Sequence, residues 1–456
     1  MKIGFPELAA IRLGFGLSPR MSPPADVAVL LAAPALAGPG PEAMTTAGAM
    51  QLAQEYRARD KARREQGAAH EPGLAEIRRQ LTRMAFDDLR RRVIRAVDDP
   101  PGFGERLVQF WADHFTVRAM GVVNTPIAMA FVDEAIRPHL GGRFEDMLIA
   151  AETHPAMLLY LDQVASRGPN SAFVRRRPDR KLGLNENLAR ETLELHSLGV
   201  GAAYTQADVR QLAELLTGLS FDYRDGFSFR PGQAEPGAET VLGRKYGGRR
   251  HGGLEDIAEA LRDIARHPAT AQHVSRKLAV HFVADDPPQD LVAALAAAWQ
   301  GSGGDLAQVY GVLATHPALA LNLRRKVRQP FDLTVAGLRA LGVSGAQLAA
   351  LEPAAFRRAI WRPLGAMGQP WGRPRGPDGW PEAAEAWIGP QTLAARVNWS
   401  LSAPRLLLAE LPDPRQMLAT SLAGTESAEL AWAVPRAESA AEGVALILAS
   451  GDFNRR

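Results

Sequence analysis

The 456-residue chain contains no cysteine, which excludes disulfides, zinc or iron–sulfur sites built on thiolates, and a thiol nucleophile. It also lacks any run approaching the roughly 18 apolar residues of a membrane-spanning helix, so no membrane span is expected. Near its start, Glu7 and Arg12 interrupt the apolar stretch, and the continuous apolar core of a signal peptide is missing. We therefore expect a soluble, cytoplasmic protein, unless a partner protein carries it out of the cell.

The chain has little net charge, with 53 lysines and arginines against 50 aspartates and glutamates. Its basic runs are short, at residues 90–92, 175–177 and 324–326, and no aromatic-rich basic ribbon accompanies them. Such runs are typical of solvated faces, so no nucleic-acid interface is expected. The sequence also has no phosphate loop, dinucleotide fingerprint, zincin motif or G-x-S-x-G elbow, so no motif names a reaction.

Apolar residues recur mostly at helical spacing, which predicts a mainly α protein, a single large helical domain over residues 1–456. Residues 44–66 and 73–98 indicate two long charged helices, and residues 47–66 are polar enough to form an exposed arm. The strongest strand signal is an alternation of aromatics around Asp225-Gly226, which predicts a small β-hairpin insertion at about residues 219–231. A Gly- and Pro-rich zone follows, with a basic loop at residues 243–253, and would divide the chain into residues 1–230 and 254–456.

Two predicted helices each direct one ionisable side chain toward an apolar face. In the helix from Asn185, the leucines at helical spacing place Glu191 near the buried stripe, where a carboxylate needs a partner. In the helix Glu105–Arg118, His114 lies four residues after Phe110 and so faces the same way. The pair is either a satisfied core hydrogen bond or a functional site, because perturbed ionisable groups gather where chemistry happens.

Further polar groups surround these two. Glu191 and Glu194, at positions i and i+3, can share one ligand or one proton, while Glu186 and Arg190 are spaced as an ion pair. His196 lies away from the Glu191 face, toward Glu186. The spacing does not match a di-metal carboxylate site, although a divalent metal stays an alternative to general acid–base hydrolysis. Lys277 lies between two histidines at four-residue spacing, on a face that is solvated or binds an anion.

Several ordered segments carry a family resemblance: RLGFG, FWADHFTV, HPAMLLYLDQVASRG, NENLARETLELHSLGVGAAYTQADVRQLAELLTG, HPATAQHVSRKLAVHFVADDPP, KVRQPFDLTVAGLRALG and the closing ILASGDFNRR. With them the chain resembles the bacterial domain of unknown function 1800 family nearly end to end. The resemblance implies a mainly helical bacterial protein whose activity is not established. It also implies a partner from the domain of unknown function 1501 family, whose members are similar to exported phosphatases or sulfatases. Asp113 stands where the family commonly has Asn.

The first hypothesis is a hydrolase-type or metal-dependent enzyme with its site between the His114 and Glu191 helices. Glu191 would be a general base or metal ligand with Glu194 as its partner, His114 an acid–base group or second ligand, and Arg190 a contact for an anionic substrate group. The residues expected to bind substrate are Asn185, Glu186, His196, His154 and Lys277. The second hypothesis is a non-catalytic helical partner or maturation factor for an exported phosphatase- or sulfatase-like protein, in which His114 and Glu191 only lock the core.

Overall fold

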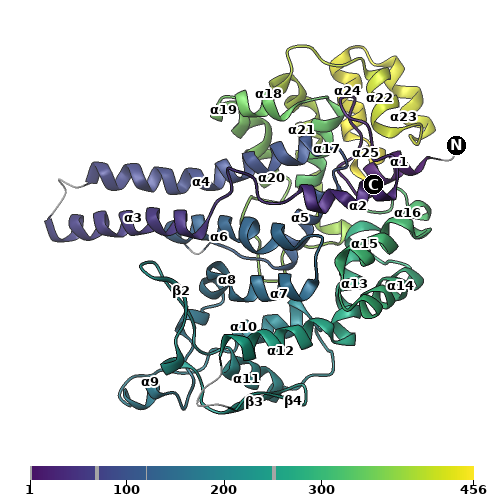
Figure 1. Ribbon diagram of the computed structural model, residues 1–456. Helices are drawn as coiled ribbons and strands as arrows, with labels where there is room; N and C mark the ends of the chain where they lie inside the picture. The colour runs from purple at the N-terminus through teal and green to yellow at the C-terminus, as the bar shows by residue number, and fades with distance from the viewer. Residues whose placement is uncertain (1–2, 67–70, 120, 249–252) are drawn as a thin grey trace.

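The protein is mainly α-helical, as the computed structural model shows for residues 3–66, 71–119, 121–248 and 253–456 (Figure 1). The mainly α prediction is therefore confirmed. The helices of the first half are α1 (Phe5–Arg12), α2 (Val27–Leu36), α3 (Thr46–Gln66), α4 (Glu71–Asp98), α5 (Phe103–His114), α6 (Thr125–Phe131), α7 (Phe144–Thr153), α8 (Pro155–Tyr160), α9 (Ala172–Arg175), α10 (Asn187–Glu191) and α11 (Gln206–Leu215). Two π-helical segments interrupt this half, η3 (Val132–Ile136) and η6 (Thr192–His196).

The second half continues as short and medium helices. They are α12 (Leu254–Arg266), α13 (Pro268–Phe282), α14 (Gln289–Ser302), α15 (Leu306–Thr315), α16 (Ala318–Leu321), α17 (Pro330–Ala340), α18 (Gly345–Ala350), α19 (Pro353–Phe356), α20 (Arg362–Ala366), α21 (Pro390–Leu407), α22 (Pro414–Leu422), α23 (Ala428–Ala433), α24 (Ala440–Ala449) and α25 (Gly451–Asn454). Helix α25 lies close to α1, so the first and last helices of the chain are neighbours (Figure 1). In the described part of the chain, no helix combines the length and apolar character that a membrane crossing needs.

The predicted hairpin is present, and a second one accompanies it. Strands β1 (Leu219–Asp222) and β2 (Gly226–Phe229) pair antiparallel, with Leu219 opposite Phe229. Gly226, the first residue of β2 directly after the turn, has φ +79°, a left-handed conformation that glycine adopts without strain. Strands β3 (Ala238–Val241) and β4 (Arg244–Gly247) form the second hairpin.

The loop predicted at residues 243–253 is therefore wrong for residues 244–247, and residues 249–252 lie outside the described residues. The second turn is made by Leu242 and Gly243, both at positive φ. Leu-Gly is not a usual hairpin-turn pair, which explains why the sequence did not indicate it. The hairpin is held on α11, because the Thr240 amide donates to Gln211 Oε1 at 2.9 Å.

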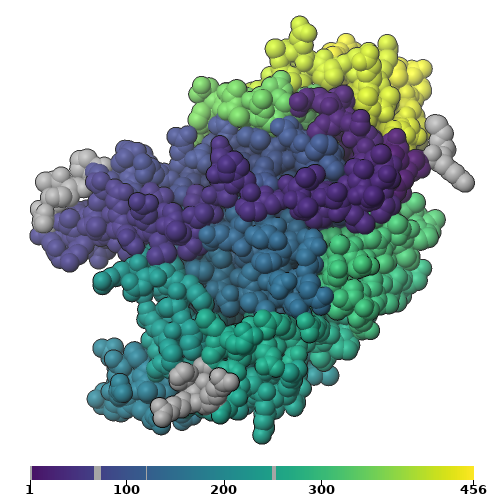
Figure 2. Space-filling view, in the orientation of Figure 1, coloured from purple at the N-terminus to yellow at the C-terminus, as the bar shows by residue number. Residues whose placement is uncertain are grey.

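Helices α3 and α4 form a long antiparallel hairpin that projects beyond the rest of the molecule (Figures 1 and 2). Small and aliphatic side chains bury the inner faces, among them Ala49 and Ala53 on α3 and Ile77 and Leu81 on α4. Outward side chains are mostly charged and pair along their own helix, as Arg64 does with Asp60 at 2.7 Å. The two long charged helices and the exposed arm are thus observed where the sequence indicated them.

The core consists mainly of two hydrophobic clusters. The larger one draws on residues between Leu8 and Leu319, from both sides of the segment 232–253, and holds Trp111 and Trp299 fully buried. The second combines Phe15 and the C-terminal half of α4 with residues from Phe331 to Phe453. Helices α4 and α5 therefore lie where the two clusters meet, and residues of these two helices also line pockets.

Candidate functional site

His114 is the last residue of α5 and is wedged among aromatic rings. The predicted helix Glu105–Arg118 ends here, because Phe115 leaves the helical region (φ −98°, ψ 57°) and the β-branched Thr116 and Val117 follow. The His114 ring lies 4.5 Å from the Phe115 ring and 5.3 Å from that of Trp111, measured between centroids. The side chain is only 2% exposed.

One hydrogen bond fixes the tautomer of His114. Its Nε2 lies 3.1 Å from the backbone oxygen of His196. A carbonyl can only accept, so the proton is on Nε2 and Nδ1 keeps a lone pair. That Nδ1 is buried and has no partner among the described residues. Burial, followed by the nearby charges of Lys277, His196 and His273, lowers the pKa of His114 well below its usual value, so the ring is neutral.

Glu191 does not reach His114, since no hydrogen bond or ion pair joins them in the described structure. The reason is the π-turn η6, which begins directly after Glu191. A π-turn rotates the chain by a smaller angle per residue than an α-helix. The residues after Glu191 therefore face another direction than α-helical spacing predicts. Leu193 and His196 are buried as a result, while Leu195 is only half-buried. Burial raises the pKa of the half-buried Glu191, with His196 opposing and Glu194 reinforcing the shift.

The carboxylate buried nearest to His196 is Glu152 of α7, which sequence reasoning missed. Its Oε1 lies 2.7 Å from His196 Nδ1, and Glu152 is completely buried. One polar atom of each side chain, Glu152 Oε2 and His196 Nε2, has no partner within the described residues. The signal available was Glu152 four residues after the core residue Leu148, on the buried face of α7.

The remaining predicted residues lie apart from His114. Arg190 bonds Glu194 at 3.2 Å and Glu186 at 3.3 Å, and Gln206 joins this surface network. Asn185 holds the local chain turn, because its Oδ1 accepts from the Asn187 amide at 2.9 Å.

His154 caps α8. Its Nδ1 accepts from the Ala156 amide at 3.1 Å and its Nε2 lies 2.9 Å from Glu134. The same His-Pro cap recurs before α13 and α16, at His267 and His316. Both ring nitrogens of His154 are thus engaged in holding helices together.

The structure instead brings His114 and Lys277 together in a polar pocket of about 350 Å³. The pocket lies between the end of α5, the middle of α13 and the loop 378–382, and it is lined by Phe110, Asp113, His114, His273, Arg276, Lys277, Val280, Asp378, Trp380, Pro381 and Glu382. Its walls come from segments more than 90 residues apart, so no local pattern could have assembled it. Its size suits a small ligand.

A glycine lets the loop 378–382 close on α5. Gly379 has φ +79°, and a Cβ there would lie 2.7 Å from both the backbone oxygen and Oδ1 of Asp113. The Trp380 amide then donates to Asp113 Oδ1 at 2.9 Å. This contact holds the Asp113 carboxyl at the edge of the pocket.

The pKa values of Asp113 and Lys277 are shifted toward one another. Burial raises the pKa of Asp113 to about 8; Glu382 and Asp378 add to the shift, and the Trp380 amide and Lys277 oppose it. Burial also lowers the pKa of Lys277, against the opposing charges of Asp113, Glu382 and Asp378. An acid that binds its proton more tightly and a base that binds it less tightly therefore share one pocket.

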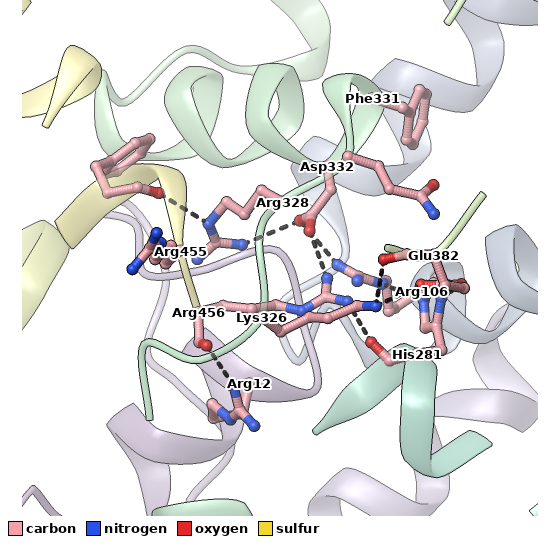
Figure 3. Close-up of polar contacts among 12 residues, drawn as sticks. Arg12, Arg106, His281, Lys326, Arg328, Phe331, Asp332, Glu382, Arg455 and Arg456 are labelled. Carbon is pink, nitrogen blue, oxygen red and sulfur yellow. Dashed lines mark hydrogen bonds and ion pairs between the residues drawn. The ribbon is translucent and has the colours of Figure 1, made fainter. Parts of the chain in front are cut away.

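Glu382 supplies a fixed negative charge to the pocket wall (Figure 3). Arg106 Nε donates to His281 Nε2 at 3.1 Å. Because a guanidinium only donates, His281 is neutral and carries its proton on Nδ1, which lies 2.6 Å from Glu382 Oε1. Lys326 Nζ lies 2.9 Å from the other oxygen. Burial alone would raise the pKa of Glu382, but His281 and Lys326 outweigh it and hold that pKa far below its usual range.

A buried ionic network supports this wall from behind (Figure 3). Asp332 of α17 forms ion pairs with three arginines: Arg106 at 2.7 Å, Arg328 at 3.0 Å, and Arg456. Arg12 in turn donates to the backbone oxygen of Arg456. Asp332 thus orients Arg106, and Arg106 orients His281 against Glu382.

No set of metal ligands can be named. Across the described ranges, no group of three or more His, Asp or Glu side chains is placed to hold a metal ion.

Comparison with known proteins adds a family and no activity. A family model described as "Protein of unknown function (DUF1800)" matches residues 9–455, nearly the whole chain. No curated protein and no solved structure matches the chain.

Proposed function

From the premise that the chain belongs to the DUF1800 family of proteins of unknown function, we propose that it is an enzyme that performs acid–base catalysis in the pocket between α5 and α13. The observation that carries this proposal is the pair Asp113 and Lys277, whose pKa values burial moves in opposite directions. Pairs of titratable groups with shifted pKa values in a cleft mark acid–base sites.

Hydrolysis of a small polar substrate is the reaction that this pair serves best. Lys277, as the neutral amine, accepts a proton from the attacking water, while Asp113, as the neutral acid, donates its proton to the leaving atom. The ionised Glu382 stabilises the ammonium that forms on Lys277. The proton then returns from Lys277 to Asp113, which restores both groups. His114 contributes a neutral wall with an acceptor nitrogen.

Two carboxylates expected at the site from the sequence have no role in this hydrolysis. Glu191 and Glu194 lie outside the lining of this pocket, so their catalytic role stays a prediction from the sequence. The same holds for Arg190, which is engaged by Glu186 and Glu194.

The reactivity of Lys277 tests the proposal without a known substrate. The chain has six lysines, and trace labelling with isotopic acetic anhydride over a pH series, read by mass spectrometry, gives a titration for each. We expect Lys277 to become reactive at lower pH than the exposed Lys181. Asp113→Asn should move the Lys277 midpoint lower still, because the lost carboxylate raises the Lys277 pKa.

Two results would contradict the enzyme proposal. One is a Lys277 that titrates with Lys181 or above it. The other is a Lys277 that acetic anhydride does not reach at any pH at which the protein stays folded, since such a pocket admits no substrate. Asp87→Asn, which removes an exposed carboxylate from α4, serves as the control and should leave the Lys277 midpoint unchanged.

A second candidate function, a helical partner for another protein, is favoured by the projecting α3–α4 hairpin (Figure 2). We propose a protein of the domain of unknown function 1501 family as that partner, with the hairpin as the contact. Reversing the arm charges in Arg63→Glu, Arg64→Glu and Arg79→Glu should abolish co-purification with it, while Lys277→Met should leave co-purification unchanged. Co-purification that survives all three reversals would rule out the hairpin as the contact.

A further inference from the structure

A second cavity lies on the other side of Asp113 and Trp380. Its volume is about 80 Å³, and most of its lining is apolar: Ala112, Val117, Ala128, Met129, Phe131, Val132, Pro370, Trp371 and Pro374. The polar lining includes Asp88, Arg92, Gln109 and Asp113. The cavity is thus small and amphipathic, and only Asp113 and Trp380 are shared with the acid–base pocket.

Arg92 of α4 is the unusual residue of this cavity. It is only 6% exposed, and its Nη1 has no partner within the described ranges. The carboxylates around it are engaged elsewhere: Asp88 by Arg91 at 2.8 Å and Trp371 at 3.0 Å, Glu105 by Arg137 at 2.6 Å and Arg95 at 2.8 Å, and Asp133 by Arg91 and Arg137, each at 3.0 Å. No ion pair within 4.0 Å involves Arg92 in the described structure.

A buried guanidinium without an ion-pair partner is costly, and Asp88, Glu105 and Asp133 attract Arg92 only from beyond ion-pair distance, so the group indicates a missing ligand. Burial lowers the pKa of Arg92 to about 10, which leaves it charged at neutral pH. The Trp371 ring, 5.5 Å from the guanidinium carbon, gives only partial compensation. A guanidinium matches the planar, bidentate geometry of a carboxylate.

The lining also limits the ligand. Asp88 and Asp113 face the same cavity, and burial raises the pKa of both, to about 8 for Asp113. A single negative charge of the ligand would reinforce the upward shift of the pKa at Asp113. A doubly charged phosphate would meet one arginine and two acidic side chains, which disfavours it. The apolar wall of Met129, Phe131 and Trp371 favours a ligand with an apolar body.

We propose that this cavity is a binding site for a small monocarboxylate, whose carboxylate pairs with Arg92 and whose apolar part lies against Met129, Phe131 and Trp371. This proposal does not rest on the acid–base proposal, because Arg92 lies outside that pocket.

Titration calorimetry with propionate and butyrate, in a buffer free of other small anions, tests the site. We expect the wild-type protein to bind at least one of them, and to bind neither propionamide nor butyramide detectably. Arg92→Met should weaken binding at least tenfold. Arg83→Met, which removes an exposed arginine from the same helix, should leave binding unchanged.

A second variant keeps Arg92, so that it tests the site even if Arg92→Met fails to fold. Ala128→Leu fills the cavity without changing its charge and should also abolish binding. The proposal is wrong if the wild-type protein binds neither carboxylate, if the amides bind as well as the acids, or if folded Arg92→Met or Ala128→Leu retains wild-type affinity. In the first case Arg92 would be a structural residue stacked on Trp371.

Discussion

Replacing Asp332 by asparagine should lower the free energy of unfolding by about 3–5 kcal/mol, the usual cost of removing one partner from a buried ionic network. Asp332 is 4% exposed and is the carboxylate with which Arg106, Arg328 and Arg456 all form ion pairs. The amide keeps the shape of the side chain but removes the negative charge. Three buried arginines would then share no carboxylate, and each would carry an uncompensated desolvation cost.

Urea denaturation followed by circular dichroism measures this loss. Asp87→Asn, on an exposed part of α4, is the matched control and should change the unfolding free energy by no more than about 0.5 kcal/mol. A loss below about 1 kcal/mol for Asp332→Asn would mean that water solvates the arginines and that the network is not buried. A folded Asp332→Asn protein should also have a disturbed pocket, because Arg106 no longer holds His281 against Glu382.

The second large effect is a pH-dependent stabilisation by Asp113→Asn. The folded protein holds the Asp113 proton up to a pKa of about 8, whereas the unfolded chain releases it near the ordinary value of 3.8. Folding therefore takes up a proton between these values, so this group makes the wild-type protein less stable as pH rises through the window. An asparagine cannot ionise and escapes that loss, and its Oδ1 can still accept from the Trp380 amide.

The variant should accordingly gain stability over the wild type as pH rises, by on the order of 3 kcal/mol between about pH 5 and pH 8. Unfolding free energies at a series of pH values, for wild type and variant, give the difference directly, and Asp87→Asn should show no such trend. A difference that does not grow with pH would mean that Asp113 has an ordinary pKa, and the acid–base proposal would lose its acid. A confirmed gain would mean that the protein retains a destabilising carboxyl group, as enzymes do at active sites.

The helices were largely predictable because helical periodicity is a property of neighbouring residues. The long charged pair became α3 and α4, and the segment after His267 became α13 with Lys277 on it. The β1–β2 hairpin was predictable for the same reason, from alternation around a glycine that adopts positive φ. The β3–β4 hairpin was not, since its Leu-Gly turn is an unusual pair that is held in place by α11.

The candidate site was predictable only in part. Periodicity correctly predicted that His114 is buried, but its hydrogen-bond partner is the His196 backbone oxygen and not Glu191. The cause is local yet invisible to α-helical spacing: the chain enters a π-turn after Glu191 and rotates His196 into the core, where it meets Glu152. Lys277 was expected on a solvated or anion-binding face, whereas α13 places it in one pocket with Asp113 and Glu382.

The sequence by itself determined that this protein is mainly helical, has no thiol chemistry and belongs to its family, because composition and local patterns suffice for those conclusions. The tertiary structure alone decided which ionisable groups meet. The Asp113–Lys277 pocket joins α5, α13 and the loop 378–382, and the Arg92 cavity joins α4, α5 and α6 to the loop that holds Trp371. Burial and neighbouring charge set the pKa values there, and both depend on how distant helices pack together.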